Sequence, residues 1–600
     1  MKNFTLSCVA ALATLATLDS DAADLPSGYW PVDLSQPILD KTRTIRLAPD
    51  LSELTDGERE AVRQLLEAGA LLQQIYEDSR HPEARASLAR LEALHASTGA
   101  GPATGNLLDL YRLNQGPIAT TLDNRREAFL PVAPEAPTRN VYPQGATREE
   151  IDAFLATHPQ RRDAILGERT VVRRGTRDDA ARDLAVLRKY PVLDTLHPGL
   201  AARLRAVAED PARHAFYAVP QSVAWADELM AVYERLNRAA DAVESDDAEF
   251  ARYLRNRSRD LLSDDYESGD AAWVTGRFNR LNLQIGSYET YDDALYGVKA
   301  FMSLSLLIRD AEASGRLAAG LASLQAVEDA LPYQGKKRVR ENIPVGAYEV
   351  IADFGQARGA NTATILPNDE LFSRRYGRTI LLRENIMRDP VLFTNTKSAW
   401  DAVMTPAQRD DLRPDGNFNR TLWHEIGHYL GVDRDATGRP LDEALESTAD
   451  SFEEMKADLV SLFAAERLRT AGYYDDASLR SVYASGILRT LQSVKPRREQ
   501  PYQTMQLMQF NWFLEHGLIT FDPQAGLLSI HYERYPEVVT SLLREVLAIQ
   551  HAGDRQRAEA FMQRWTAWTP DVHEVIAGKR RASLGFRYVI VTFTAIDGGG

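Results

Sequence analysis

Apolar residues recur at every third or fourth position through the first part of the chain, from Leu51 to about Leu262. The segments LTDGEREAVRQLLEAGALLQQIYEDS and SVAWADELMAVYERLNRAADAV show this spacing, which gathers apolar side chains on one face of a helix. Proline and glycine cluster at residues 99–103 and 131–144, as they do in surface connections. The pattern therefore predicts a mostly helical region.

The pattern changes near Asn282, where alternating and β-branched positions become frequent. LNLQIGSYETY is predicted to be extended, and the following segment, DDALYGVKAFMSLSLLIRDAEAS, is predicted to return to helix. The segments AYEVIADFG and RTILLREN predict strands, with the long loop ARGANTATILPNDE between them. This middle region is therefore expected to supply most of the sheet.

Helical spacing resumes toward the C-terminus. Two helices are predicted from Phe418 to about Leu468, and further helices at residues 475–494 and 504–516. LITFDPQAGLLSIHY predicts a hairpin, because two apolar runs flank a proline and glycine turn, and GFRYVIVTFTAI predicts a final strand. The whole chain is therefore expected to be an α+β protein that is predominantly helical.

Length and charge narrow the possibilities further. A chain of 600 residues exceeds one folding unit, so two lobes or domains are expected. The hydrophobic fraction of 44% and the charged fraction of 26% are ordinary for a soluble globular protein with a large core. The net charge of −15 argues against a general nucleic-acid-binding protein, which usually has a basic excess.

The N-terminal segment has the pattern of a secretory signal peptide over residues 1–23: one lysine, an apolar run, and small residues ending at Ala23. The run is too short to span a membrane, and no other stretch reaches that length. We therefore predict an exported protein, periplasmic or secreted. Because the only cysteine, Cys8, lies in this segment, a metal site in the mature chain must use His, Asp and Glu.

The stretch WHEIGHY, residues 423–429, contains two histidines four positions apart. On a helix this spacing places His424 and His428 on one face, where both can bind one Zn²⁺. Glu425 lies beside them and can take a proton from an activated water. The alternative reading is a pair of ordinary histidines on a helix surface.

Zinc in a hydrolase needs a third protein ligand. The candidates lie in LDEALESTADSFEEMKADLVSLF, whose acidic residues are Asp442, Glu443, Glu446, Asp450, Glu453, Glu454 and Asp458. Glu454 and Asp458 are four apart, beside an apolar stripe, so one can bind the metal and the other can accept the N–H of a ligating histidine. A zinc hydrolase site with one ion is predicted, and amide hydrolysis suits its residues best.

Several segments together resemble the dipeptidyl peptidase III family of metallopeptidases. They are FEEMKAD behind the paired histidines, IGSYETYDDALYG, and ADFGQARGANTATILPNDE. The histidine motif has five residues here, whereas most members of the family have six. The likeness covers residues 280–520 well and the helical N-terminal part loosely.

The resemblance implies a role for each matching residue. His424, His428 and Glu454 would bind zinc, and Glu425 would be the general base. Glu453 and Asp458 would orient the histidines, and Tyr291 would stabilise the tetrahedral intermediate. Glu289 and Asn368 would hold the free N-terminus and the backbone of the peptide. Tyr502 stands where the family has a histidine near the scissile bond; it can donate a hydrogen bond to the oxyanion but cannot act as an imidazolium.

The resemblance also implies two lobes separated by a wide cleft. Residues 24–308 plus about 350–394 would form a mixed lobe with a β-barrel-like core. About 309–349 plus 395–600 would form the mainly helical zinc lobe. Closure of the lobes over a peptide would exclude water from the site.

These observations lead to one expectation and two alternatives. We expect a zinc peptidase that releases dipeptides from the N-termini of short peptides. One alternative is an aminopeptidase or another zinc hydrolase with a different amide substrate, because Tyr502 departs from the family. The other is a non-catalytic peptide-binding protein on a peptidase fold. No nucleic-acid partner and no membrane span are expected, and the working assumption for the oligomeric state is a monomer.

Overall fold

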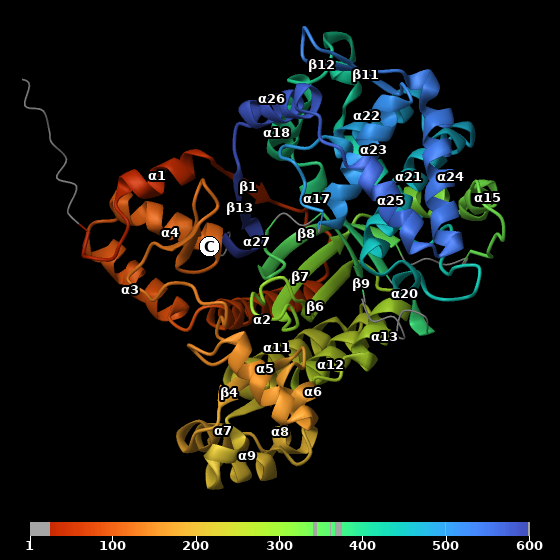
Figure 1. Ribbon diagram of the computed structural model, residues 1–600. Coiled ribbons are helices and arrows are strands. Elements are labelled where there is room, and N and C mark those ends of the chain that lie inside the picture. Colours follow the sequence, from red (N-terminus) through yellow and green to blue (C-terminus); the bar gives the residue numbers. More distant parts are fainter. Residues whose placement is uncertain are drawn as a thin grey trace, which may run out of the picture.

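The computed structural model describes residues 25–339, 345–359, 362–366, 375–377, 379–498 and 500–597. Helices predominate, and the longer strands gather in one sheet near the middle of the molecule (Figure 1). The predicted class, α+β and predominantly helical, is confirmed. The expected signal peptide and Asn368 lie outside the described residues. No helix in the described ranges is both long enough and apolar enough to cross a membrane.

The central sheet has five strands in the order β6-β7-β8-β10-β9. They are β6 (Leu281–Glu289), β7 (Phe301–Arg309), β8 (Val345–Gly355), β9 (Ala363–Leu366) and β10 (Thr379–Arg383). Only the pair β8 and β10 is parallel; the other neighbours are antiparallel. Within the described residues this sheet is open, where the family resemblance implies a barrel-like core.

The helix predicted over residues 292–314 is wrong at its centre, because β7 occupies Phe301–Arg309. The strand lies between β6 and β8, and most of its side chains are buried. A strand buried on both faces loses the alternation of polar and apolar positions that identifies a half-exposed strand. The run AFMSLSLLI therefore gives no periodicity that distinguishes it from a buried helix.

Helices of the N-terminal part cover the sheet. The helix α2 (Asp56–Arg80) packs against β7 and β8, and α11 (Ala226–Val243) packs against α2. The remaining helices before the sheet are α1 (Val32–Asp40), α3 (Ala84–Ser97), α4 (Pro102–Asn114), α5 (Arg148–Thr157), α6 (Arg162–Ile165), α7 (Arg177–Lys189), α8 (Pro191–Leu196), α9 (Leu200–Glu209), α10 (Gln221–Ala224), α12 (Ala248–Ser263) and α13 (Glu267–Thr275). The mostly helical character predicted for this region is confirmed.

Two small two-stranded sheets among these helices were not predicted. They are β2 (Ile118–Thr120) with β3 (Arg126–Ala128), and β4 (Thr170–Arg174) with β5 (Phe216–Pro220). The predicted final strand is present as β13 (Tyr588–Phe593), and it pairs in parallel with β1 (Thr42–Leu47). Toward its end the described chain therefore returns to its N-terminal part, where β13 also contacts α4 (Figure 1).

The C-terminal part is built around α21 (Ala449–Thr470). Residues on nearly all faces of this helix are buried, as expected for a helix that is enclosed by others. Its neighbours are α19 (Pro414–Gly427), α22 (Asp476–Thr490), α23 (Pro501–Glu515) and α24 (Tyr535–Ala552). The other elements are α14 (Ala311–Leu321), α15 (Leu324–Ala330), α17 (Glu384–Met387), α18 (Pro390–Asp401), α20 (Leu441–Leu445), α25 (Arg555–Trp565), α26 (Val575–Ser583), α27 (Thr594–Asp597), and the predicted hairpin of β11 (Ile519–Asp522) with β12 (Leu527–Ile530).

The sheet joins two hydrophobic cores. One core contains the N-terminal helices and most of β6, β7 and β8, and the other contains the C-terminal helices. Successive residues of β10 alternate between them, with Leu381 in the first core and Ile380 and Leu382 in the second. The sheet thereby connects the C-terminal helices to the N-terminal helices. The lobe boundaries given above stay predictions.

Candidate metal centre

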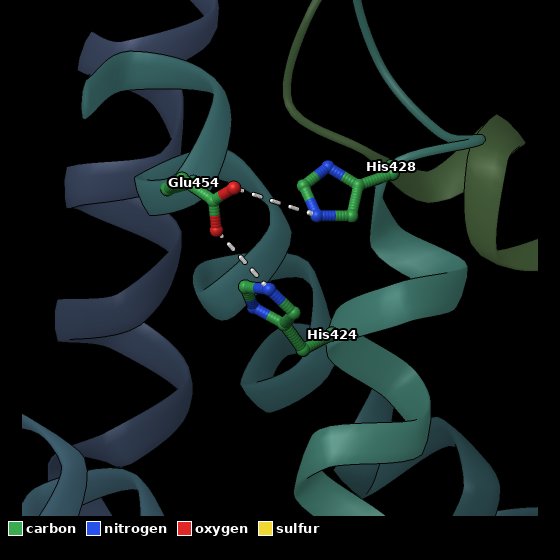
Figure 2. Close-up of side chains that lie close together, drawn as sticks. All are labelled: His424, His428 and Glu454. Atoms are coloured by element: carbon green, nitrogen blue, oxygen red, sulfur yellow. Dashed lines mark ion pairs between the residues drawn. The ribbon is translucent and has the colours of Figure 1, made fainter. Parts of the chain in front are cut away.

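Two neighbouring helices bring together the three side chains with metal-ligand chemistry. His424 lies in the last turn of α19, His428 directly follows that helix, and Glu454 lies in α21. Nε2 of His424 is 3.3 Å from Oε2 of Glu454, and Nε2 of His428 is 4.0 Å from its Oε1. Figure 2 shows the carboxylate of Glu454 with both imidazoles turned toward it.

Close packing of α19 against α21 makes these distances possible. A Cβ atom at Gly427 would lie 2.7 Å from the carbonyl oxygen of Ala457 and 2.9 Å from its Cα. Any larger residue at this position would therefore push the helices apart. The helix also begins earlier than predicted, at Pro414, because proline suits the first helical position, where no N–H partner is needed.

The other ring nitrogen of each histidine faces a second carboxylate. Nδ1 of His424 is 2.6 Å from Oδ1 of Asp458, and Nδ1 of His428 is 3.0 Å from Oε1 of Glu453. Such a contact fixes the ring orientation and keeps the proton on Nδ1, which leaves Nε2 free to bind a metal. Both histidines are thus oriented with Nε2 toward Glu454.

Asp458 is held by cations as well as by His424. Its Oδ1 accepts a hydrogen bond from Nη1 of Arg420 at 3.0 Å, and its Oδ2 lies 3.6 Å from Nε of Arg489. Burial alone would raise the pKa of Asp458, but Arg489 and His424 outweigh burial and hold this pKa well below its usual range. The carboxylate is therefore charged whenever the protein is folded at neutral pH.

Glu453 has a similar environment nearer to solvent. Nζ of Lys456 lies 2.7 Å from its Oε1, and Nε2 of Gln550 donates to its Oε2 at 3.4 Å. Burial opposes ionisation, but Lys456 and the hydrogen bond to His428 lower the pKa of Glu453 to about 2. Both carboxylates that orient the histidines are therefore ionised at neutral pH.

The three converging side chains fit a divalent metal ion. Their ligand atoms all lie within 4.8 Å of one another. Oε2 of Glu454 is buried and has no hydrogen-bond partner, although His424 is close by. A buried carboxylate oxygen without a partner is costly, and a cation at this point would satisfy it. Two imidazoles and one carboxylate form a donor set that zinc favours.

Two cavities meet at this centre, with volumes of about 540 Å³ and about 820 Å³. The larger one is lined from one side by the sheet and from the other by α19, α20 and α21, so it lies between the two hydrophobic cores. Glu425, which is half-buried, borders both cavities. The residues lining both cavities are Glu425, His428, Glu454 and Tyr502.

The structure brings three further predicted site residues to the larger cavity. Glu289 ends β6, Tyr291 lies in the loop that follows, and Tyr502 begins α23 on the opposite side. Both tyrosines are exposed, but partial desolvation of the phenol and the nearby Glu289 raise the pKa of Tyr291 to about 12. Partial desolvation and Glu454 also raise the pKa of Tyr502. Both phenols therefore keep their protons at neutral pH and can donate hydrogen bonds.

Sequence reasoning missed several residues that support the centre. They are Arg420, Arg489 and Gln509 around Asp458, with Lys456 and Gln550 beside Glu453. Arg420 had a detectable signal, because it precedes His424 by four residues and so shares its helix face. Lys456 had one too, because it follows Glu453 by three residues on α21. Arg489, Gln509 and Gln550 come from α22, α23 and α24, and nothing in their local sequence indicates this role.

Comparison with curated proteins gives a partial match. No family model matches the chain. Nudix hydrolase 3 of Arabidopsis thaliana is 26% identical over 375 residues, which is 61% of this chain and 48% of that protein. The chain thus spans about half the length of this relative.

Comparison with solved structures covers nearly the whole chain. DPP III from Caldithrix abyssi superposes with a TM-score of 0.78 at 23% identity, over 94% of this chain and 100% of that one. Dipeptidyl-peptidase III from Corallococcus sp. strain EGB gives a TM-score of 0.70 at 23% identity, over 95% and 98% of the two chains. The protein therefore has the two-lobed fold of these structures, as the sequence resemblance implied.

Proposed function

We propose that the protein is a zinc-dependent peptidase of the dipeptidyl peptidase III type, which releases dipeptides from the N-termini of short peptides. The observation that supports this most is the convergence of His424, His428 and Glu454, with Glu425 beside them, at a cavity between the two hydrophobic cores. The shared fold with two such peptidases supports the same reading.

The side chains at the centre have separate tasks in amide hydrolysis. A zinc ion held by His424, His428 and Glu454 would supply Lewis-acid activation of a water molecule and of the peptide carbonyl. Glu425 accepts the proton of the attacking water and delivers it to the leaving amine. Glu453 and Asp458 keep the two imidazoles in the orientation that binding requires.

Two phenols can stabilise the charge that develops on the carbonyl oxygen. Tyr291 and Tyr502 border the larger cavity from opposite sides, and both are protonated at neutral pH. A hydrogen bond aimed at the developing oxyanion stabilises the transition state more than the substrate. Glu289 lies beside Tyr291, where its carboxylate can bind the ammonium group of a free peptide N-terminus.

The shape of the site favours short, extended chains. Its catalytic residues lie where the two cavities meet between the lobes, a position that a folded protein cannot easily reach. We include in the proposal one zinc ion, a monomer, and export to the periplasm or the medium by the N-terminal segment.

One experiment tests the proposed activity. The purified chain is incubated with matched peptides whose N-termini are free or acetylated, with zinc or with a chelator, and the products are identified by mass spectrometry. Dipeptides should appear only from free N-termini and only with metal. Glu425→Gln should keep zinc and lose about 100- to 10,000-fold in kcat. Glu466→Gln, on the same helix as Glu454 but outside both cavities, is the matched control.

Other outcomes would favour the alternatives. Release of single amino acids would identify an aminopeptidase, and cleavage of acetylated peptides would contradict recognition of the free N-terminus. Peptide binding without any cleavage by the zinc-loaded protein would identify a binding protein on a peptidase fold. Retention of activity by Glu425→Gln would contradict its role as the base.

A further inference from the structure

The metal centre lies where two cavities of opposite charge meet. The acidic residues lining the larger cavity, apart from Glu425 and Glu454, are Glu289, Asp433, Asp442, Asp450 and Glu453. The lysine and arginine that line it in the described part of the chain are Lys456, which pairs with Glu453, and Arg383, which donates to Ser305 beside Asp353. The larger cavity is therefore negative overall.

The smaller cavity has the opposite character. Three guanidinium groups line it, from Arg420 of α19, Arg489 of α22 and Arg580 of α26. Among the described residues, the acidic ones that line it are Glu425 and Glu454, which belong to the reaction centre itself. Away from the metal centre, this cavity is therefore lined by positive charge.

Arg580 is the group whose charge is least compensated. It takes part in no ion pair of the described structure, and its Nη1 donates to the backbone carbonyl of Leu491. Its Nε is buried and has no hydrogen-bond partner, and burial lowers the pKa of the side chain to about 10. Because an enclosed charge is costly unless it is paired, a bound anion would stabilise this arrangement.

Two residues of α22 add further hydrogen-bond donors. Nε of Arg489 is 3.6 Å from Asp458, but that carboxylate is already closer to Arg420 and His424. Oγ of Ser485, one turn earlier on the same helix, is buried and has no hydrogen-bond partner. The wall formed by α22 and α26 thus offers donors that the protein itself does not fully use.

We propose that Arg580 and Arg489 form a subsite for the C-terminal carboxylate of the peptide substrate. The inference rests on the proposed peptidase function and specifies its substrates as peptides that end shortly after the scissile bond. A guanidinium group suits a carboxylate, because its planar donors match the two oxygens.

The opposite charges of the two cavities also give the substrate one direction. A short peptide has a positive N-terminus and a negative C-terminus, which match the larger and the smaller cavity respectively. The scissile bond would then lie at the metal centre between them. Longer peptides would lose the second interaction, because their carboxylate lies beyond the smaller cavity.

The test compares one peptide sequence as the free acid and as the C-terminal amide. Both forms have the same N-terminus and scissile bond, so only the terminal charge differs. For a tetrapeptide, the zinc-loaded protein should have a kcat/KM about 10- to 100-fold higher for the acid. This ratio should fall toward one as the same sequence is lengthened to an octapeptide.

Variants then assign the effect to Arg580. Arg580→Gln should lower kcat/KM for the acid far more than for the amide and so bring the acid-to-amide ratio close to one, and Arg580→Lys should restore part of the preference. Arg581→Gln is the matched control, because the adjacent Arg581 is exposed and pairs with Glu574. Its ratio should equal that of the wild type.

The possible failures are distinguishable. If the wild type cleaves acid and amide equally well, the carboxylate subsite is wrong and the peptidase function stands. A preference that persists in Arg580→Gln would also refute the assignment. If the zinc-loaded protein cleaves neither peptide, the proposed function is wrong, and calorimetric binding of the same two peptides decides the subsite: equal affinities contradict it, and tighter binding of the acid supports it.

Discussion

Asp458 is the carboxylate on which both the metal centre and the charge balance behind it depend. Its side chain is only 3% exposed, and it is the partner of His424, Arg420 and Arg489. The substitution Asp458→Asn preserves size and removes the charge. Two guanidinium groups would then share a buried region with no carboxylate between them.

The expected loss of stability is large. Breaking a buried ion pair by removing one partner costs about 3–5 kcal/mol, because the remaining charge stays buried. Arg420, whose side chain is 7% exposed, has little access to water that could replace Asp458. The lost contact to His424 should separately weaken zinc binding about 10- to 100-fold.

The two effects are measured separately. Urea unfolding with a chelator present gives the stability of the metal-free protein, and a competition titration gives the zinc affinity. Glu466→Gln is the control, because it removes an ion pair on the same helix whose partners, Glu466 and Arg469, are 36% and 38% exposed. The control should lose less than about 1 kcal/mol and should bind zinc normally.

The dependence of the free energy of unfolding on pH provides a further check on the contribution of Asp458. Burial raises the pKa of Asp458, but Arg489 and His424 outweigh it, so the folded value lies below the unfolded one. The contribution of Asp458 is therefore complete above its unfolded pKa of about 4 and is lost as the pH falls toward the folded value. A metal-free Asp458→Asn as stable as the wild type at pH 7 would refute the reasoning.

Three further substitutions test other parts of the centre. Glu453→Gln should weaken zinc binding about 10- to 100-fold in a competition titration, because His428 loses its orienting partner; unchanged affinity would contradict this. If the proposed role of its hydroxyl at the developing oxyanion is correct, Tyr502→Phe should lower kcat about 100-fold with little change in KM; steady-state kinetics on one peptide decide this. Gly427→Ala should cost about 1–3 kcal/mol in urea unfolding, because the added methyl group meets the carbonyl oxygen of Ala457 at 2.7 Å; unaltered stability would exclude the proposed close packing.

The candidate metal site was the most predictable feature, because the geometry of its two histidines is local. Residues four apart on a helix share a face whatever surrounds them, so His424 and His428 could be paired from sequence alone. The third metal ligand was less well determined, because the spacing of Glu454 and Asp458 allowed either residue to take this role. Only the tertiary packing of α19 against α21 distinguishes them, with Glu454 facing both Nε2 atoms and Asp458 facing Nδ1 of His424.

The strands show where local patterns fail. β6 and β8 alternate enough to be recognised, but β7 is buried between them and was predicted as helix. The short strands β4 and β5 pair across a long stretch of helical sequence, so neither has a neighbour in the chain that would indicate a hairpin. For β7 the burial of both faces removes the alternation, and for β4 and β5 the partner is distant in sequence; periodicity contains no information about either.

The positive charge of the smaller cavity is the feature that the sequence alone predicts least well. The run Lys579-Arg580-Arg581 has the composition of a solvated helix end. Adjacent residues on a helix point about 100° apart, so packing α26 against α18 encloses one arginine and exposes the next. Arg581 accordingly pairs with Glu574, which directly precedes its helix, whereas Arg580 donates to the carbonyl of Leu491 and has no carboxylate partner in the described structure. Two identical residues side by side thus have different chemistry, and the phase of the helix decides which one can bind a substrate.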